Sequence, residues 1–410
     1  MPTPIPSPMP TPSKMPRLYE AFLGHAHGCV ALAEEADAAL AGPDQAAVLH
    51  EMDQDRECLL AALRWLRAQR GGGLLGSRLT LALCRFWEIR GYWTEARQWL
   101  AAMVTMADGE EGFDEALLAR MLNEAGIFAC RRRQSDWESA SLLFQRALAI
   151  HNELDDLKGQ GISLNGLGAV ALLQGEQAAA KKFFEESIAI GHRRGDPGDV
   201  ANGMGNLALV YSNDRDYAAA EKLQNQSLDS QREIGNQRRI ADALSNLGSI
   251  HMLQGNYQEA KRHHQESLDL KLALGYQPGL VGSHVNIAKI LENGGEYGEA
   301  RRHLREALTI NKNIGDMAEF ACVFGGLADV ASSQGLNEWF ILWYAVSTAL
   351  RKKHRIPLPA ADAEEIKSYI AGIRASLGEQ AFQRAWRRGR TMSLESAIAQ
   401  VLESTDLGLP

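Results

Sequence analysis

The stretch Ala243–Ala260, ALSNLGSIHMLQGNYQEA, decides the fold, because it holds an apolar stripe, a turn and the start of a second stripe. Its larger apolar residues recur at intervals of three, the spacing of one helix face: Leu244, Leu247, Ile250 and Leu253. Gly255 ends this helix, since glycine accepts the left-handed conformation of a helix C-terminus. A second stripe runs from Tyr257 to Leu272. We therefore expect two antiparallel helices joined by a short turn.

The same pattern returns every forty residues. An apolar residue recurs at Leu167, Leu207, Leu247, Ile287 and Leu327, each followed by Gly or Ala, and an alanine recurs at Ala140, Ala180, Ala220, Ala260 and Ala300. The turn glycines are Gly175, Gly255, Gly295 and Gly335, with Arg215 as the exception. One helix pair cannot bury its apolar face alone, so we expect neighbouring pairs to stack.

These residues resemble the tetratricopeptide repeat family, through Leu247-Gly248 in the first helix and Ala260 and Leu268 in the second. The usual repeat has about 34 residues, and the longer period resembles the variant of kinesin light chains and bacterial signal-transduction proteins. The resemblance covers roughly residues 115–350. It implies an all-α, right-handed superhelical solenoid of antiparallel helix pairs with helical N- and C-terminal caps.

Four segments are expected along the chain. They are a disordered proline-rich tail at 1–17, an N-terminal helical region with one divergent repeat at 18–110, the repeat array at 111–350 and a helical cap at 351–410. The tail holds seven of the thirteen prolines, which exclude helix. Residues 55–66, 86–100 and 377–402 resemble the sensor arms of bacterial STAND-class ATPase regulators, although the chain lacks their GxxxxGK[ST] phosphate loop.

Composition and charge narrow the function further. The formal charge of −8 excludes a global basic surface, so nucleic acid is not expected as a partner. The five cysteines are widely spaced and never form CxxC, and we interpret them as small buried apolar groups, with no metal or other cofactor. No apolar run reaches the length of a membrane helix. The N-terminus has no signal-peptide pattern, so the expected location is cytoplasmic.

Asparagine stands directly before the apolar-small pair in three successive repeats, at Asn206, Asn246 and Asn286. In the resembled family this position of the first helix points into the concave groove. An amide offers both a donor and an acceptor, so this row can pair with peptide groups of an extended ligand. Its expected companions are Asn165, Asn202, Asp242, Ser245, Ser249 and Lys289. The alternative is that these amides bond neighbouring helices and only fix their packing.

Histidines gather at His251, His263, His264, His284 and His303. Zinc needs about four converging ligands, whereas these residues follow the repeat period with no cysteine nearby in sequence. We therefore expect them on a polar outer face and not around a metal.

Three functions follow from the resemblance and the residues. The first is a non-catalytic scaffold or sensor in bacterial signalling, which binds a protein or peptide in its groove. The second is a response-regulator phosphatase, in which residues 18–80 form a helical bundle that offers Gln45, Gln54 or Gln69. The third is an assembly adaptor that associates through its aromatic C-terminal face. The sequence leaves the ligand and the oligomeric state open.

Overall fold

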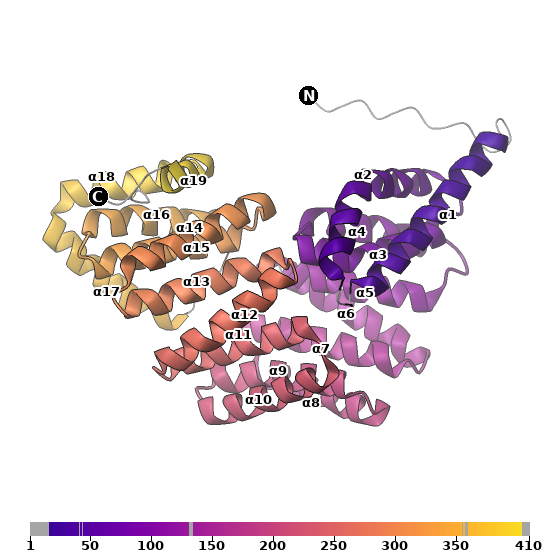
Figure 1. The fold of residues 1–410 in the computed structure, drawn as a ribbon, viewed down its shortest axis with the longest axis horizontal. Helices are drawn as coiled ribbons and strands as arrows, with labels where there is room; N and C mark the ends of the chain where they lie inside the picture. Colours follow the sequence, from indigo (N-terminus) through magenta and orange to yellow (C-terminus); the bar gives the residue numbers. More distant parts are fainter. Residues whose placement is uncertain are drawn as a thin grey trace. The chain divides into compact units, whose positions relative to one another are not determined.

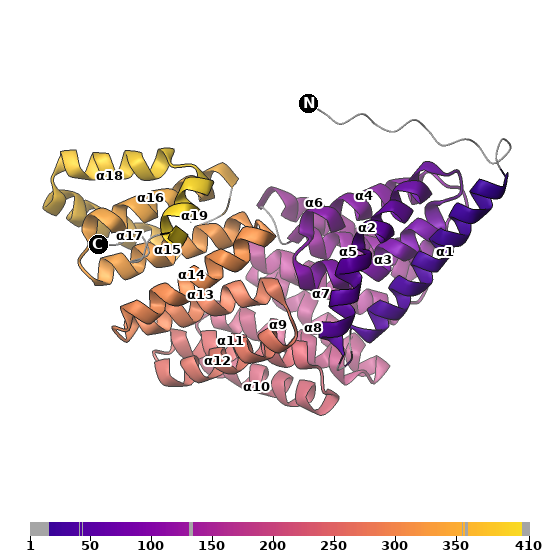
Figure 2. The same cartoon turned by 45° about the horizontal axis from the view of Figure 1, so that its top comes forward.

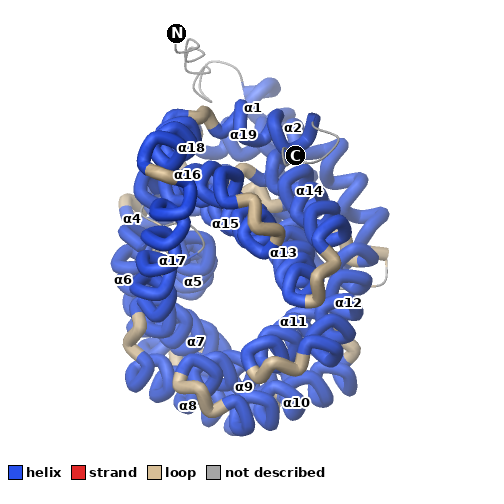
Figure 3. Tube along the Cα trace, turned by 90° about the vertical axis from the view of Figure 1, so that its left-hand side faces the viewer, coloured by secondary structure: helices blue, strands red, loops and turns tan. Residues whose placement is uncertain are grey.

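The computed structural model describes residues 16–40, 42, 44–130, 134–354, 356 and 360–403. Among these residues the regular secondary structure is helical, and none of them lies in a strand (Figure 3). This confirms the expected all-α class. Residues 1–15 of the proline-rich segment 1–17 lie outside the described residues. The first helix begins at Pro16. Among the described residues, no helix combines the length and the apolarity needed to cross a membrane.

Nineteen helices follow one another in the described residues (Figures 1 and 2). In chain order they are α1 (Pro16–Ala39), α2 (Gln45–Ala68), α3 (Gly73–Arg90), α4 (Trp93–Asp108), α5 (Glu115–Cys130), α6 (Gln134–Glu153), α7 (Leu157–Gln174), α8 (Gln177–Arg194), α9 (Pro197–Asn213), α10 (Tyr217–Ile234), α11 (Gln237–Leu253), α12 (Tyr257–Ala273), α13 (Gln277–Asn293), α14 (Tyr297–Ile314), α15 (Met317–Ser333), α16 (Asn337–His354), α17 (Ala360–Leu377), α18 (Glu379–Thr391) and α19 (Leu394–Glu403). They form two compact units: the first comprises the described parts of Met1–Phe128 and Leu142–Ser163, and the second those of Ala129–Ser141 and Leu164–Pro410.

The first unit has a core built on α3, which packs against α1, α2 and α4. Phe86 and Trp87 of α3 are fully buried. The indole nitrogen of Trp87 donates to Glu95 Oε1 at 2.6 Å, and Arg56 holds the other oxygen of that carboxylate, with Nη2 at 2.6 Å from Oε2. The half-buried carboxylate therefore joins α2, α3 and α4 with both oxygens paired, which a partly desolvated charge requires.

The second unit is a stack of helix pairs. Each first helix packs along the helix that follows it, as in α9 with α10, α11 with α12, α13 with α14 and α15 with α16. Each second helix then packs on the next first helix, as in α8 on α9 and α10 on α11. The apolar side of one pair is therefore covered by the next pair, which is how repeat solenoids bury a core that no single repeat possesses.

The two helices of a pair can pack closely because a Gly or Ala follows the recurring apolar residue of the first helix, as Gly168 follows Leu167. A Cβ added to Gly168 would lie 2.5 Å from the Phe184 ring, and one added to Gly248 would lie 2.7 Å from the His264 ring. In each case the ring comes from the second helix, sixteen residues further along the chain. The equivalent residues of two other repeats are Ala208 and Ala288, and the residues sixteen positions further on are Gln224 and Leu304. Small residue and facing side chain therefore fit one another repeat by repeat.

A recurring hydrogen bond fixes the register of these pairs. Ser227 Oγ donates to the backbone oxygen of Ala201 at 2.7 Å. Ser267 donates to Ala241 and Ser347 to Ala321, also at 2.7 Å. Each bond joins a buried hydroxyl on the second helix to the backbone of the first. A slip of one residue would leave the buried hydroxyl without its acceptor, which costs about 1–3 kcal/mol.

The turns behave as their glycines predict. Gly175 and Gly255 have φ of 81° and 79°, and Arg215 adopts the same left-handed conformation with φ of 62°. The backbone of the repeat therefore requires this conformation even where the residue is not glycine, at a cost of roughly 1–2 kcal/mol for an L-residue.

Aromatic side chains close the last repeat pair. Phe340 and Tyr344 of α16 contact the rings of Tyr369 on α17 and Trp386 on α18, with centroids 5.3 and 6.3 Å apart. A Cβ on Gly389 would lie 2.4 Å from the backbone oxygen of Leu342, so α18 lies directly on the α16 backbone. The helices α17–α19 thereby cover apolar surface that the end of an array would expose.

The fit between Gly248 and His264 predicts a coupled pair of substitutions. Gly248→Ala should lower the free energy of unfolding by about 1–3 kcal/mol, because its methyl group meets a buried ring. In a His264→Leu background the same change should cost much less, since Ala288 already packs with Leu304 in the third pair. Urea denaturation of the four proteins measures the coupling. Gly282→Ala is the matched control, because a Cβ there meets nothing within 4 Å. Equal costs of Gly248→Ala in both backgrounds would contradict this packing.

Candidate binding surface

The three asparagines of the row lie at equivalent turns of α9, α11 and α13, and all three are half-buried. Because the repeat period is constant, their companions form parallel columns beside them: Asn202 with Asp242, Asn165 with Ser245, and Ser249 with Lys289. The structure therefore brings the predicted residues onto the first helices of consecutive repeats. None of the asparagines is deeply buried, so part of each amide remains open to solvent.

The first two amides of the row bond neighbouring helices. Asn206 Nδ2 donates to Asn165 Oδ1 at 2.8 Å, which joins the first helices of two repeats. Asn246 Nδ2 lies 3.5 Å from Gln224 Oε1, at the upper limit for a hydrogen bond. Each bond uses one of the two N–H donors and leaves the amide oxygen available. These packing bonds therefore leave the oxygen atoms of the same side chains available for a further hydrogen bond.

The third amide differs from the other two. Within the described part of the chain, no side chain or backbone group is hydrogen-bonded to the Asn286 amide. Lys289, one turn further along α13, is exposed. This end of the row is therefore the most open to a ligand.

The companions are partly occupied. Asn202 Oδ1 accepts from Gln231 Nε2 at 3.2 Å, and Ser249 Oγ donates to the Ser245 backbone oxygen of its own helix at 3.0 Å. Asp242 lies 4.0 Å from Arg239, at the limit of an ion pair. The surface thus carries amides, hydroxyls and charges of both signs, with no cluster of cations that would select a carboxylate.

The histidines are not on an outer polar face, contrary to the sequence-based expectation. His263, His264, His284 and His303 are all buried. Nδ1 of His284 lies 2.9 Å from Nδ1 of His303, and the rings of His251 and His263 stack at 5.3 Å. The reason is positional, because His264 stands where other repeats have Phe184 and Leu304. Alignment of the second-helix columns would have revealed this from the sequence.

Burial keeps these histidines neutral. Together with the nearby ammonium of Lys271, it lowers the pKa of His264 to about 4. Burial, followed by the charge of His284, lowers the pKa of His303 to about 4. Lys271 is itself buried, and its Nζ donates to Ser283 Oγ at 3.0 Å. The pairs α11/α12 and α13/α14 therefore contain buried imidazoles whose protonation lowers the stability of the folded protein.

The glutamines considered for phosphatase chemistry do not meet. Gln45 is buried at the first residue of α2, Gln54 contacts His50 on an exposed turn, and Gln69 follows the last residue and donates to the Trp65 backbone oxygen. At a rise of about 1.5 Å per residue, the first and the last are about 36 Å apart along the helix. They cannot act together on one substrate group, so phosphatase chemistry would rest on one of them alone.

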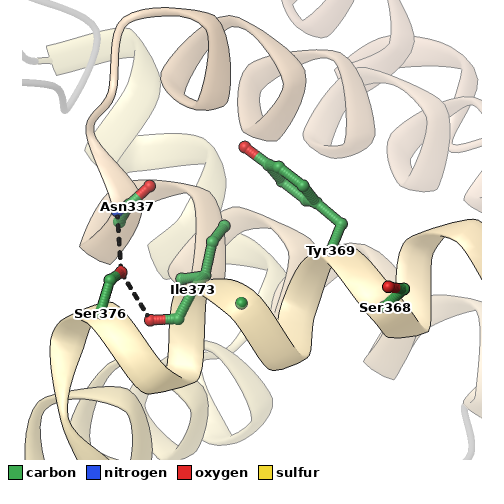
Figure 4. Close-up of a pocket in the computed structure, with 6 residues that line it drawn as sticks. Asn337, Ser368, Tyr369, Ile373 and Ser376 are labelled. Carbon is green, nitrogen blue, oxygen red and sulfur yellow. Dashed lines mark hydrogen bonds between the residues drawn. The ribbon is translucent and has the colours of Figure 1, made fainter.

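A hollow of about 540 Å³ lies where α17 passes the start of α16 (Figure 4). Asn337 Nδ2 donates to Ser376 Oγ at 3.4 Å, and Tyr369 lines the hollow further along α17. The sequence did not predict this hollow. Its lining has hydroxyl and amide groups but no carboxylate, imidazole or cationic side chain, so it offers no acid–base pair for chemistry.

The fold and the repeated surface define a helical-repeat protein. Residues 117–191, 199–273 and 239–313 match the tetratricopeptide repeat family. The repeats in this part of the chain therefore belong to that family, as the sequence predicts. It is a family of protein-binding scaffolds that are generally non-catalytic. No curated protein matches the chain in a sequence search.

Solved structures with the same fold include two Rap proteins. A Rap protein complexed with Competence and Sporulation Factor has a TM-score of 0.59 at 15% identity, over 92% of this chain and 99% of that chain. The apo form of RapI has a TM-score of 0.51 at 15% identity, over 67% and 99%. BtubC (BKLC) from P. vanneervenii has a TM-score of 0.41 at 18% identity, over 55% and 91%. At these identities the likeness to the Rap proteins shows a shared fold alone.

The buried histidines predict a stability that depends on pH. The folded-state pKa of His264, about 4, lies below the unfolded value of 6.5, so the unfolded chain binds the proton first. The contribution of His264 is complete above pH 6.5 and is lost as the pH falls toward 4. This loss amounts to on the order of 3 kcal/mol.

His264→Leu should therefore flatten the fall of stability on acidification. Urea denaturation of both proteins over this pH range measures the difference, and the exposed His27→Ala serves as the control. Parallel pH profiles for the wild type and His264→Leu would contradict the buried, neutral state of His264.

Proposed function

We propose that this protein is a non-catalytic regulatory scaffold of bacterial signalling that binds an extended peptide, or an extended segment of a partner protein, along α9, α11 and α13. The observation that carries the proposal is the row of half-exposed amides on these three consecutive first helices. Such a row offers donors and acceptors in a repeated order, which suits a ligand whose own polar groups repeat.

The spacing of the helices fits the repeat of an extended chain. The first helix α11 contacts both α9 and α13, and packed helices lie about 8–10 Å apart. An extended chain rises about 3.3 Å per residue, so neighbouring amides face peptide groups about three residues apart, and three amides span about seven residues. Pairing with the backbone supplies affinity for many sequences, whereas contacts with side chains supply selectivity.

The hydrogen bonds that the row makes to neighbouring helices are compatible with this function, because they leave acceptor atoms unused. The amide oxygens of Asn206 and Asn246 remain available after their bonds to Asn165 and Gln224, and these bonds hold the amides in place before a ligand arrives. A preorganised group loses less conformational entropy on binding. Asn286, which has no such bond among the described residues, would order only when the ligand binds.

The Rap protein complexed with Competence and Sporulation Factor supports the proposal by analogy. It shows that a chain of this fold, matched over nearly its whole length, carries a bound factor. The phosphatase alternative is not advanced, since nothing in the geometry of α2 favours one of its three glutamines over the others. The adaptor alternative is not advanced either, because α17–α19 cover the aromatic face of α16 on which it depended.

Asn286→Ala should weaken binding without weakening the fold. The probe is a fluorescent decapeptide selected on the wild-type protein from a random display library, with affinity measured by anisotropy. Loss of one or two backbone hydrogen bonds, each of about 1 kcal/mol, lowers the affinity by roughly five- to thirtyfold. The melting temperature should stay unchanged, because Asn286 supports no neighbouring helix.

Asn225→Ala is the matched control, since this asparagine is exposed on the second helix α10. It should alter neither affinity nor melting temperature. Full affinity in Asn286→Ala, or an equal loss in Asn225→Ala, would contradict the proposed surface, as would the absence of any selectable peptide.

A further inference from the structure

Two thiols and one imidazole converge between the first two helices. His25 and Cys29 lie four residues apart on α1 and therefore share one face, and Cys58 lies opposite them on α2. The His25 Nε2 atom lies 3.6 Å from Cys29 Sγ and 3.4 Å from Cys58 Sγ, and the two sulfur atoms are 4.0 Å apart. In the described part of the chain, these three residues form the one cluster of His, Cys, Asp or Glu close enough to share a cation.

These separations match those within a tetrahedral zinc site. Zinc lies about 2.3 Å from a thiolate and about 2.0–2.1 Å from an imidazole nitrogen. In a regular tetrahedron these bond lengths place nitrogen about 3.5 Å from sulfur, and the two sulfur atoms about 3.8 Å apart. The three observed distances differ from these values by a few tenths of an ångström. A disulfide, in contrast, needs a sulfur–sulfur distance of about 2.05 Å.

The surroundings suit a cation that enters from solvent. Cys29 is 6% exposed, whereas His25 and Cys58 are exposed. The expectation that all five cysteines are buried apolar groups is therefore wrong for Cys58. Burial is the largest cause that raises the pKa of Cys29, followed by the neighbouring Cys58 and then by the charge of Asp55, which stands three residues before Cys58 on α2. That carboxylate would help to neutralise a divalent cation beside the two thiolates.

We propose that His25, Cys29 and Cys58 form a binding site for a thiophilic cation of the zinc type. The three residues supply one imidazole and two thiolate ligands, and the fourth position remains open to water. Sulfur ligands select zinc-type cations over magnesium or calcium, which prefer oxygen. On binding, the cation displaces the two thiol protons, which pass to solvent. The bound ion joins α1 to α2, so that loading with metal stabilises the first unit.

Cobalt titration of the full-length, tag-free, reduced protein under inert gas tests the site. One Co²⁺ per chain should bind, with the near-ultraviolet absorption of thiolate-to-cobalt charge transfer and the visible bands of tetrahedral geometry, and one Zn²⁺ should displace it. Zn²⁺ should also raise the melting temperature. Cys29→Ser and Cys58→Ser should abolish the charge-transfer band or reduce it strongly. His25→Ala should weaken Co²⁺ binding by more than the roughly 10–100-fold that follows loss of an outer-shell partner.

His27→Ala is the matched control, because His27 is exposed on the same helix two residues away. It should bind Co²⁺ as the wild type does. The melting temperature of each variant without metal shows whether the variant is folded. The absence of stoichiometric binding to the folded wild type would overturn the proposal. So would undiminished binding to Cys58→Ser, which would place the ion elsewhere, such as at the buried histidines.

Discussion

Each repeat depends on one steric constraint: the first helix must carry a small residue where the second helix presents a side chain sixteen residues further on. Gly168 faces Phe184 and Gly248 faces His264, at distances that leave no room for a Cβ. The buried serine bonds, such as Ser227 to Ala201, then hold the register. Because the repeats share a small residue at this position, consecutive pairs present equivalent faces and can stack into an array.

Because packing uses only one face of each first helix, the opposite face is available to contact a ligand. The packing side carries the apolar and small residues, while the residue just before them is half-exposed in three consecutive repeats. An asparagine at this position can donate to a neighbouring helix and still offer an acceptor to a ligand. The constancy of the period turns single amides into a row, which is why the proposed ligand is an extended chain and not a compact molecule.

The period of forty residues was enough to predict the helices of the repeats and their pairing, whereas the left-handed conformation of Arg215 was not predicted. It also placed the asparagines on equivalent turns. It did not predict which amides bond each other, since the contact between Asn206 and Asn165 depends on how two repeats are rotated. The burial of His264 was missed because histidine is usually polar, although two other repeats have the apolar residues Phe184 and Leu304 at the same position. The cluster of His25, Cys29 and Cys58 was also missed, because its members come from two helices outside the periodic region.

Amide hydrogen exchange, with and without a selected extended peptide, tests the central claim most directly. The account predicts that the peptide slows exchange in α9, α11 and α13 and leaves their partners α10, α12 and α14 unchanged at the solvent-facing turns. Exchange that slows only in the second helices, or only in α16–α19, would contradict the assignment of the amide-bearing face as the binding surface.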